Sequence, residues 1–159
     1  LNGLMTTADA ATFHRERLEQ ARNDFGGEVL ARLRRGASYT VSEYAHARRM
    51  QTELRRCFES WFVEHGGALD AVVLPTTPVP APRIQGLDAV AVAPVLTRFT
   101  APFNSTGLPA LSVPCGTTRE GLPIGLQLVC APWAERRLLR VGHAFEQAVS
   151  ERRPRAVAR

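Results

Sequence analysis

The sequence predicts an α/β protein in which helices pack on a small sheet. Apolar residues recur at helical spacing from residue 6 to about residue 64, and a second helical pattern covers residues 133–150. Between these patterns lie three short apolar runs bounded by proline or glycine, which is typical of strands. Helical segments on both sides of a few strands favour a layered α/β fold. A sheet of three strands is small, so we expect it to be part of a larger structure.

Two helices are predicted at the start of the chain. The first covers residues 6–25, and Thr6 has the position of its N-cap. Two glycines separate it from a shorter helix at residues 28–35, which Gly36 is expected to cap at its C-terminal end.

A long helix follows, because Thr40 and Glu43 have the spacing of a capping box. Its apolar stripe consists of Ala47, Met50, Leu54, Cys57 and Trp61, widened by Phe58 and Phe62. A helix of about two dozen residues spans about 35 Å, which is a full domain diameter. Gly66 and Gly67 are its expected end.

The first strand is predicted at residues 70–75, a valine-rich run that Pro75 closes. Residues 75–86 then form an extended surface loop, since their prolines fit neither a helix interior nor a central strand. Residues 87–95 are apolar but have no clear period, and we assign them no element.

A short helix is predicted at residues 96–107, with Gly107 as its end. Strands follow at residues 108–114, closed by Pro114, and at residues 124–132. Because a short turn joins them, we expect the two strands to be antiparallel neighbours. The last helix is expected to bury Leu138, Val141, Phe145 and Ala148.

The basic residues are all arginines, and the sequence contains no lysine. The formal net charge is +5. A mechanism that needs lysine as a base or as a Schiff-base former therefore cannot be completed by this chain alone. Arginines alternate with glutamates along the predicted helices, which is typical of a solvated face, so we expect no specific nucleic-acid partner.

The remaining composition predicts a cytoplasmic protein without cofactor, metal or membrane anchor. The three cysteines have no CxxC spacing, which indicates reduced thiols. The sequence has no signal peptide, no run of about twenty apolar residues, and no phosphate-, dinucleotide- or metal-binding motif. The chain begins with Leu1, and we expect it to be a fragment.

Two potential nucleophiles, Ser112 and Cys115, lie in or beside a predicted strand. A serine nucleophile needs an exposed position and a base within hydrogen-bond reach, and no histidine is marked as that base. We therefore expect Ser112 and Cys115 to be packing residues. A catalytic Cys115 is the alternative, and it would need a histidine partner. Taken from its residues alone, the chain has no complete catalytic constellation.

Several motifs resemble the C-terminal third of amidase-signature enzymes, a family of amidases and glutamyl-tRNA(Gln) amidotransferase A subunits. They are DAVVLPTTPVPAP at residues 70–82, RFTAPFNSTGLPALSVPCG at 98–116, GLPIGLQLV at 121–129 and ERRLLRVGHAFEQ at 135–147. The helical stretch at residues 25–58 is also similar to the family. The resemblance extends from about residue 6 to residue 150.

The resemblance implies a partial amidase-signature α/β/α sandwich, with helices packed on part of a mixed sheet. It assigns residues 1–150 to the C-terminal part of the domain and leaves residues 151–159 as a disordered basic tail. It also implies cleavage of carboxamide C–N bonds by a Ser–cis-Ser–Lys triad located N-terminal to these motifs. We therefore expect no catalytic residue in this chain and no activity of the chain alone.

The resemblance also implies which residues line the substrate cleft. Arg32 matches the position at which amidotransferase-type members place an arginine near a substrate carboxylate, which a guanidinium can bind through two hydrogen bonds. Thr97 stands where tRNA-linked members carry an acidic residue for the α-amino group of glutamine. Arg98, Thr100 and Phe103 fall on the element that resembles the cleft wall. The alternative is that Arg32 is solvated and the others only pack.

The expected function is that of the C-terminal portion of an amidase acting on a small carboxamide, where it completes the sheet and lines the cleft. One alternative is an amidotransferase A subunit, which Thr97 weakens, and another is a non-catalytic structural or interaction relative. The expected partners are the carboxamide substrate and the missing N-terminal part of the fold. Exposed apolar faces of such a piece also predict a homodimer.

Overall fold

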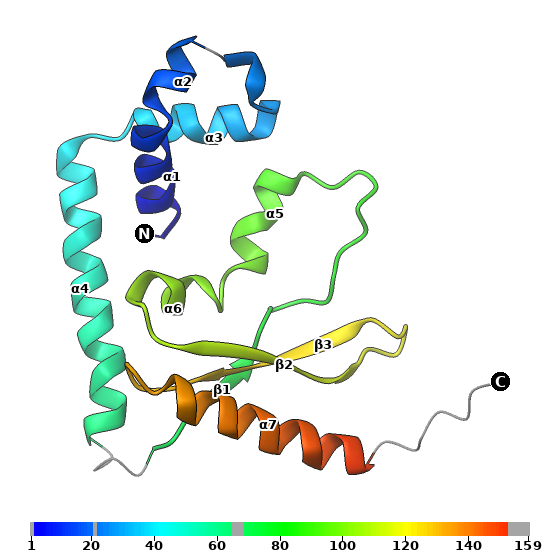
Figure 1. Cartoon of the computed structure of the whole chain (residues 1–159). Coiled ribbons are helices and arrows are strands. Elements are labelled where there is room, and N and C mark those ends of the chain that lie inside the picture. Colours follow the sequence, from blue (N-terminus) through cyan, green and yellow to red (C-terminus); the bar gives the residue numbers. More distant parts are fainter. Residues whose placement is uncertain (1, 21, 65–68, 153–159) are drawn as a thin grey trace. The chain divides into compact units, whose positions relative to one another are not determined.

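The order of elements along the chain is α1–α2–η1–α3–α4–β1–α5–α6–β2–β3–α7 (Figure 1). The chain divides into two compact units, Leu1–Cys57 and Phe58–Arg159. The computed structural model describes residues 2–20, 22–64 and 69–152.

Helices make up the N-terminal unit. They are α1 (Asn2–Phe13), α2 (Arg15–Gln20), the 3-10 turn η1 (Arg22–Asp24), α3 (Gly27–Ala37) and the first part of α4 (Val41–Glu64). The single helix predicted for residues 6–25 is therefore wrong, since it is broken at His14. Thr6 is not its N-cap, because the backbone is already helical from Asn2 onward.

Gly36 is a packing glycine and not the predicted C-cap. It is buried inside α3, where a Cβ atom would overlap the backbone carbonyl of Thr7 in α1. The glycine therefore lets the two helices approach closely. The helix ends one residue later, at Ala37, and the Ser38 hydroxyl donates a hydrogen bond of 2.8 Å to the Arg35 carbonyl.

The predicted capping box at the start of α4 is confirmed. The Thr40 hydroxyl accepts from the Glu43 amide at 3.2 Å, and the Glu43 carboxylate accepts from the Thr40 amide at 2.8 Å. The Thr40 backbone N–H, and then its hydroxyl, hold the pKa of Glu43 below its usual value. Two residues of the predicted stripe, Met50 and Cys57, are exposed. The predicted end at Gly66 and Gly67 lies outside the described residues.

The C-terminal unit is built on an antiparallel sheet of three strands. They are β1 (Val72–Pro75), β2 (Ala110–Thr117) and β3 (Pro123–Val129), in the spatial order β1-β3-β2. Strand β3 is therefore central, with Gln127 opposite Ser112 on one side and opposite Leu74 on the other. The predicted antiparallel pairing of β2 with β3 is confirmed.

Pro114 does not close its strand, which corrects the prediction. Strand β2 continues to Thr117 and has an irregularity between Pro114 and Gly116. Among the described strands β2 pairs with β3 alone, so it is an edge strand. Proline is tolerated in edge strands and at bulges because its missing N–H removes no ladder hydrogen bond there.

Helix α7 (Glu135–Arg152) covers one face of this sheet (Figure 1). The buried cluster between them consists of Val113, Leu128, Cys130 and Leu138. Burial raises the pKa of the Cys130 thiol. The predicted stripe is confirmed for Leu138, Val141 and Phe145, whereas Ala148 is exposed.

The ends of α7 differ from the prediction. The helix begins at Glu135 and not at residue 133, because Trp133 has a φ of 63°, which lies in the left-handed region. At its other end α7 runs to Arg152, into the predicted tail, and residues 153–159 lie outside the described residues.

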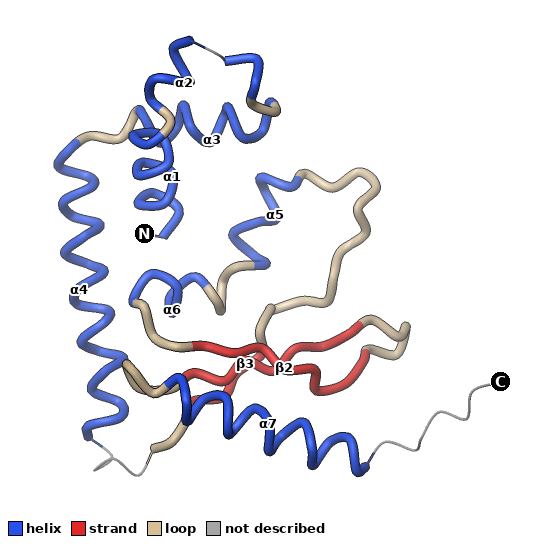
Figure 2. The backbone as a smooth tube through the Cα atoms, viewed as in Figure 1, coloured by secondary structure: helices blue, strands red, loops and turns tan. Residues whose placement is uncertain are grey.

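Helices α5 (Ala89–Leu96) and α6 (Ala101–Thr106) lie on the other side of the sheet from α7 (Figure 1). Helix α5 occupies the residues to which we assigned no element, and Asp88 caps it by accepting from the amides of Val90 and Ala91. The end of α6 is as predicted, because Gly107 adopts a left-handed φ of 73°. The proline-rich residues between β1 and α5 form a long loop, as predicted (Figure 2).

Candidate functional site

The segment from Thr97 to Thr100 is the bend that joins α5 to α6, and Phe103 lies in α6 just after it. Thr97 ends α5, where its amide and its hydroxyl both donate to the Ala93 carbonyl, at 3.0 and 2.8 Å. The Thr97 carbonyl in turn accepts from the Ala101 amide at 2.8 Å, in the first turn of α6. The bend is thus fixed locally by hydrogen bonds, and the Thr97 hydroxyl is already engaged in one of them.

Arg98 is the charged residue of this bend. It is exposed, and its guanidinium makes no hydrogen bond or ion pair with another described residue. Thr100 holds the N-cap position of α6, is half-buried, and donates from its hydroxyl to the Thr97 carbonyl at 3.3 Å. A planar cation on a fixed bend suits recognition of a carbonyl or carboxylate oxygen.

Phe103 supports the bend through its buried side chain. Its side chain is 4% exposed, and its ring lies 5.2 Å from the ring of Phe58. The ring is therefore covered by other residues of the same unit. Phe103 supports the segment that carries Thr97, Arg98 and Thr100.

Arg32 lies in the N-terminal unit, on α3. Its side chain is exposed and makes no hydrogen bond or ion pair with the part of the chain that the structure describes. The structure thus brings together four of the predicted site residues, on the bend and in the α6 helix that follows it, and places Arg32 in the other unit. On α3 the Arg32 guanidinium is available to a ligand.

The sheet face below the bend carries polar residues that the sequence analysis did not single out. Gln127 is 3% exposed and donates from Nε2 to the Phe99 carbonyl at 2.9 Å. The hydroxyls of Thr76 and Ser112 lie 2.7 Å apart, on either side of Gly125, where a Cβ would come within 2.8 Å of both oxygens. Alternation along β3 was the available signal, since it places Gln127 on the face opposite Leu126 and Leu128.

Neither potential nucleophile has the surroundings of one. Ser112 is exposed, so the prediction that it is a packing residue is wrong, but its hydrogen-bond partner is another hydroxyl and not a base. The Cys115 thiol lies 3.4 Å from the Ile124 carbonyl, to which it donates. An activated serine or cysteine needs an adjacent general base or a strongly lowered pKa.

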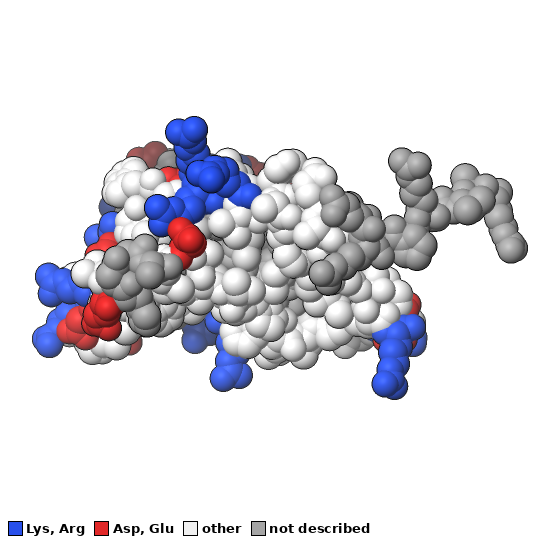
Figure 3. Space-filling view, turned by 90° about the horizontal axis from the view of Figure 1, so that it is seen from below, with Lys and Arg blue, Asp and Glu red and all other residues white. Residues whose placement is uncertain are grey.

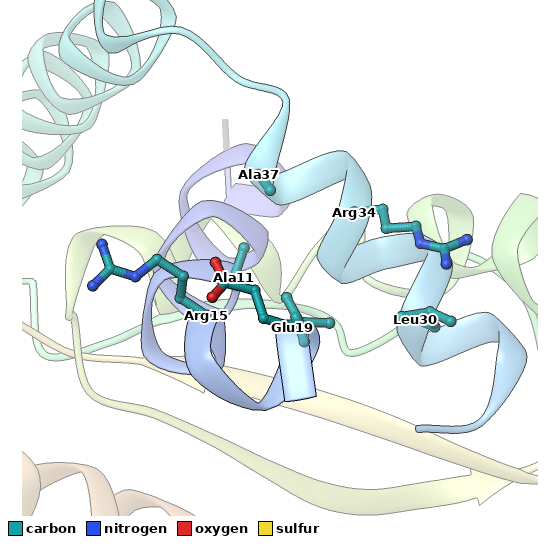
Figure 4. A pocket seen from close by; sticks show the side chains of 7 residues that line it. Ala11, Arg15, Glu19, Leu30, Arg34 and Ala37 are labelled. Atoms are coloured by element: carbon teal, nitrogen blue, oxygen red, sulfur yellow. The ribbon is translucent and has the colours of Figure 1, made fainter. Parts of the chain in front are cut away.

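Two hollows in the described part of the N-terminal unit contain no predicted site residue. The first, of about 370 Å³, is lined by Ala11, Arg15, Leu18, Glu19, Leu30, Arg34 and Ala37. Figure 4 shows that the side chains of Arg15 and Arg34 point in opposite directions. The second hollow includes Asp9 and Tyr44, and the Tyr44 hydroxyl donates to the Asp9 carboxylate at 2.8 Å. The charged groups of the first hollow do not converge as those of a binding pocket do.

Arginines stand out at separate places on the face shown in Figure 3, several of them beside acidic side chains. Two ion pairs of the described residues are Arg49 with Glu53 at 3.0 Å and Arg137 with Asp70 at 3.1 Å.

Among the described helices, none combines the length and the apolar character that a bilayer crossing requires.

A family model described as Amidase matches residues 4–139 of the chain. The chain belongs to the amidase family. It is 40% identical over 126 residues to a fatty acid amide hydrolase of Medicago truncatula, which covers 76% of this chain and 20% of that relative. It is 36% identical over 129 residues to the A subunit of the glutamyl-tRNA(Gln) amidotransferase of Myxococcus xanthus, which covers 77% of this chain and 26% of that relative.

Solved amidase-family structures share this fold. A chain of a vestigial protein complex related to the origins of an s-triazine catabolic enzyme superposes with a TM-score of 0.80 at 26% identity, over 92% of this chain and 33% of its own. A 6-aminohexanoate cyclic dimer hydrolase gives a TM-score of 0.72 at 26% identity, over 98% and 35%. The chain therefore spans about a third of the length of these solved relatives, and the described fold is a partial α/β fold.

Proposed function

We propose that this chain is the C-terminal portion of an amidase-family hydrolase that cleaves the C–N bond of a small carboxamide. The family match over residues 4–139 carries this proposal. It is supported by similar proteins that include a fatty acid amide hydrolase and a 6-aminohexanoate cyclic dimer hydrolase. In this proposal the chain works in the cytoplasm without metal or cofactor, together with the N-terminal part of the same fold.

The chemistry is assigned to residues outside this chain. The family resemblance implies a Ser–cis-Ser–Lys triad, and this chain contains no lysine. Ser112 is exposed and faces a second hydroxyl, which cannot remove the serine proton at neutral pH. This portion instead completes the sheet and lines the acyl side of the cleft.

Each predicted site residue has a distinct role in this proposal. Arg98 contacts the substrate through its unpaired guanidinium, and Thr97 and Thr100 give the bend its shape through their hydrogen bonds. Phe103 supports the bend through its packing on Phe58. Arg32 binds a carboxylate of the substrate or product through two parallel hydrogen bonds.

An amidotransferase A subunit is the second candidate, and the match to the relative in Myxococcus xanthus favours it. Against it stands Thr97, whose neutral hydroxyl donates to the Ala93 carbonyl where an acidic residue would hold an α-amino group. A non-catalytic relative is the third candidate. Ammonia transfer to a glutamate-charged tRNA by the complete protein would establish the amidotransferase candidate. Absence of any amide turnover by the complete protein would establish the non-catalytic candidate.

An NMR titration tests the cleft assignment on the chain as it stands. We expect a primary carboxamide such as benzamide to shift the amide resonances of residues 97–100, and benzoate to shift those around Arg32. Arg98→Ala should weaken the first response, and Arg32→Ala should weaken only the second. Exposed Arg49, which pairs with Glu53 on α4, offers a matched control as Arg49→Ala. Shifts that leave both regions untouched would contradict the assignment.

A further inference from the structure

Gln127 is a buried polar side chain in the middle of the sheet. Its neighbours Leu126 and Leu128 belong to the apolar cluster under α7. Because side chains alternate along a strand, Gln127 points to the opposite face. It is 3% exposed, and a buried amide needs hydrogen-bond partners to offset the loss of water. The hydrogen-bond partner of Gln127 therefore shows which segment this buried side chain holds in place.

That partner is the backbone of the bend between α5 and α6. The Gln127 side chain donates from Nε2 to the carbonyl oxygen of Phe99, at 2.9 Å. Phe99 comes directly after Arg98 and before Thr100, so the bond fixes the middle of the segment. It connects the central strand to a loop 28 residues away in the sequence.

The neighbouring helices add little support on the α5 side. None of the eight residues of α5 is buried, although the helix is almost entirely apolar. On the other side, α6 is held by the Phe103 ring against Phe58. Gln127 thus supplies a tertiary contact in the middle of the bend, and Phe103 supplies one on the α6 side.

We infer that Gln127 is a positioning residue, which fixes the bend above the sheet and thereby the direction in which Arg98 is presented. The inference deepens the proposed function, on which its relevance to substrate binding rests. The geometric claim itself concerns one hydrogen bond and can be tested without substrate.

The first test replaces the donor by an apolar side chain of similar length, in Gln127→Met. Without the donor, the half-buried Phe99 carbonyl loses its partner on the sheet, and the bend should open more often. We expect the Ala101 and Asn104 amides, which bond to Thr97 and Thr100, to exchange with solvent roughly tenfold faster. Amides of β3 should keep their protection, and the exposed Gln147→Met on α7 is the control.

The second test uses the variant Gln127→Glu. It asks whether a protonated carboxyl at position 127 restores the hydrogen bond to the Phe99 carbonyl. A protonated carboxyl can donate to the Phe99 carbonyl, whereas a carboxylate can only accept. We expect the protection factors of the bend, corrected for intrinsic exchange, to match the unmodified chain in acid and to fall as the new carboxyl ionises. Burial alone also opposes ionisation of a carboxyl, so the specific result is a loss of protection at the Ala101 and Asn104 amides while the amides of β3 keep theirs.

These outcomes separate the inference from the proposed function. The positioning role would be overturned if Gln127→Met lost amide protection in all strands together, or if the protection of the bend amides did not change. If Gln127→Met does not fold, Gln127→Glu decides, because its bend either tightens in acid or does not. A bend that loosens as expected while benzamide still leaves residues 97–100 unshifted would keep the positioning role and remove the cleft assignment.

Discussion

Gly36 shows how much one residue decides in the N-terminal unit. Its sequence context, at the end of a helical pattern and before a capping box, resembles a C-cap. The actual requirement is the contact with the Thr7 carbonyl in another helix, and a contact between helices leaves no mark in local sequence. Sequence reasoning therefore places a glycine correctly near a helix end and misses why it is needed.

We expect Gly36→Ala to lower the free energy of unfolding by about 1–3 kcal/mol, because α1 and α3 must move apart to admit the methyl group. Gly3→Ala in α1 is the control, since no atom lies within 4 Å of the added Cβ. That control should be neutral or stabilising by up to about 1 kcal/mol, through helix propensity alone. Urea unfolding of both variants measures the difference, and equal effects would refute the role of the contact.

Glu43 carries a pH dependence at the residue scale. Hydrogen bonds from Thr40 lower the pKa of its carboxyl in the folded chain, so the stabilisation is present above the unfolded pKa. It is lost as the pH falls through the lower, folded pKa. Glu43→Gln keeps the shape without the charge. We expect the difference in melting temperature between the two proteins at pH 7 to vanish in acid, and a difference that is constant with pH would contradict this.

At the scale of elements, the failures of sequence reasoning have a common physical cause. Helix α5 has no hydrophobic period because none of its residues is buried, so periodicity could not reveal it. The Asp88 cap was the signal available. Pro114 was read as a strand end because the edge position of β2 depends on pairing, which local sequence does not encode. Elements with a buried stripe, such as α7, were predicted well.

The contact between α6 and α4 is expected to be a main support of the bend. Phe103→Ala removes a ring that is 4% exposed and should lower the free energy of unfolding by about 3–5 kcal/mol. Phe13→Ala, at a side chain that is 84% exposed, should change it by less than about 0.5 kcal/mol. Denaturant titration distinguishes the two variants. Similar effects of both would show that the Phe103–Phe58 contact does not support the unit.

At the scale of the whole molecule, the chain exposes large apolar side chains. In the C-terminal unit they include Val73, Ile84, Trp133 and Leu139. Such residues favour association with another surface. We expect the purified chain to dimerise or aggregate as its concentration rises, which light scattering measures. A monomer throughout the concentration series would count against this prediction.

The family was readable from the sequence, because several motifs keep the spacing of amidase-signature enzymes, and the match over residues 4–139 confirms it. The site was readable only in part. The resemblance indicated the bend that carries Arg98, but the buried bond from Gln127 to Phe99 depends on how a strand and a distant loop meet. That contact follows from the fold and not from any local pattern.

We propose that this chain shapes a cleft whose catalytic groups lie outside it. The most direct measurement is ammonia release from a panel of primary carboxamides by the purified chain of 159 residues. We expect release no faster than in buffer, for the unmodified chain and for Ser112→Ala and Cys115→Ala alike. Release by the unmodified chain that either substitution abolishes would contradict it, because a nucleophile of amide hydrolysis would then lie in this chain.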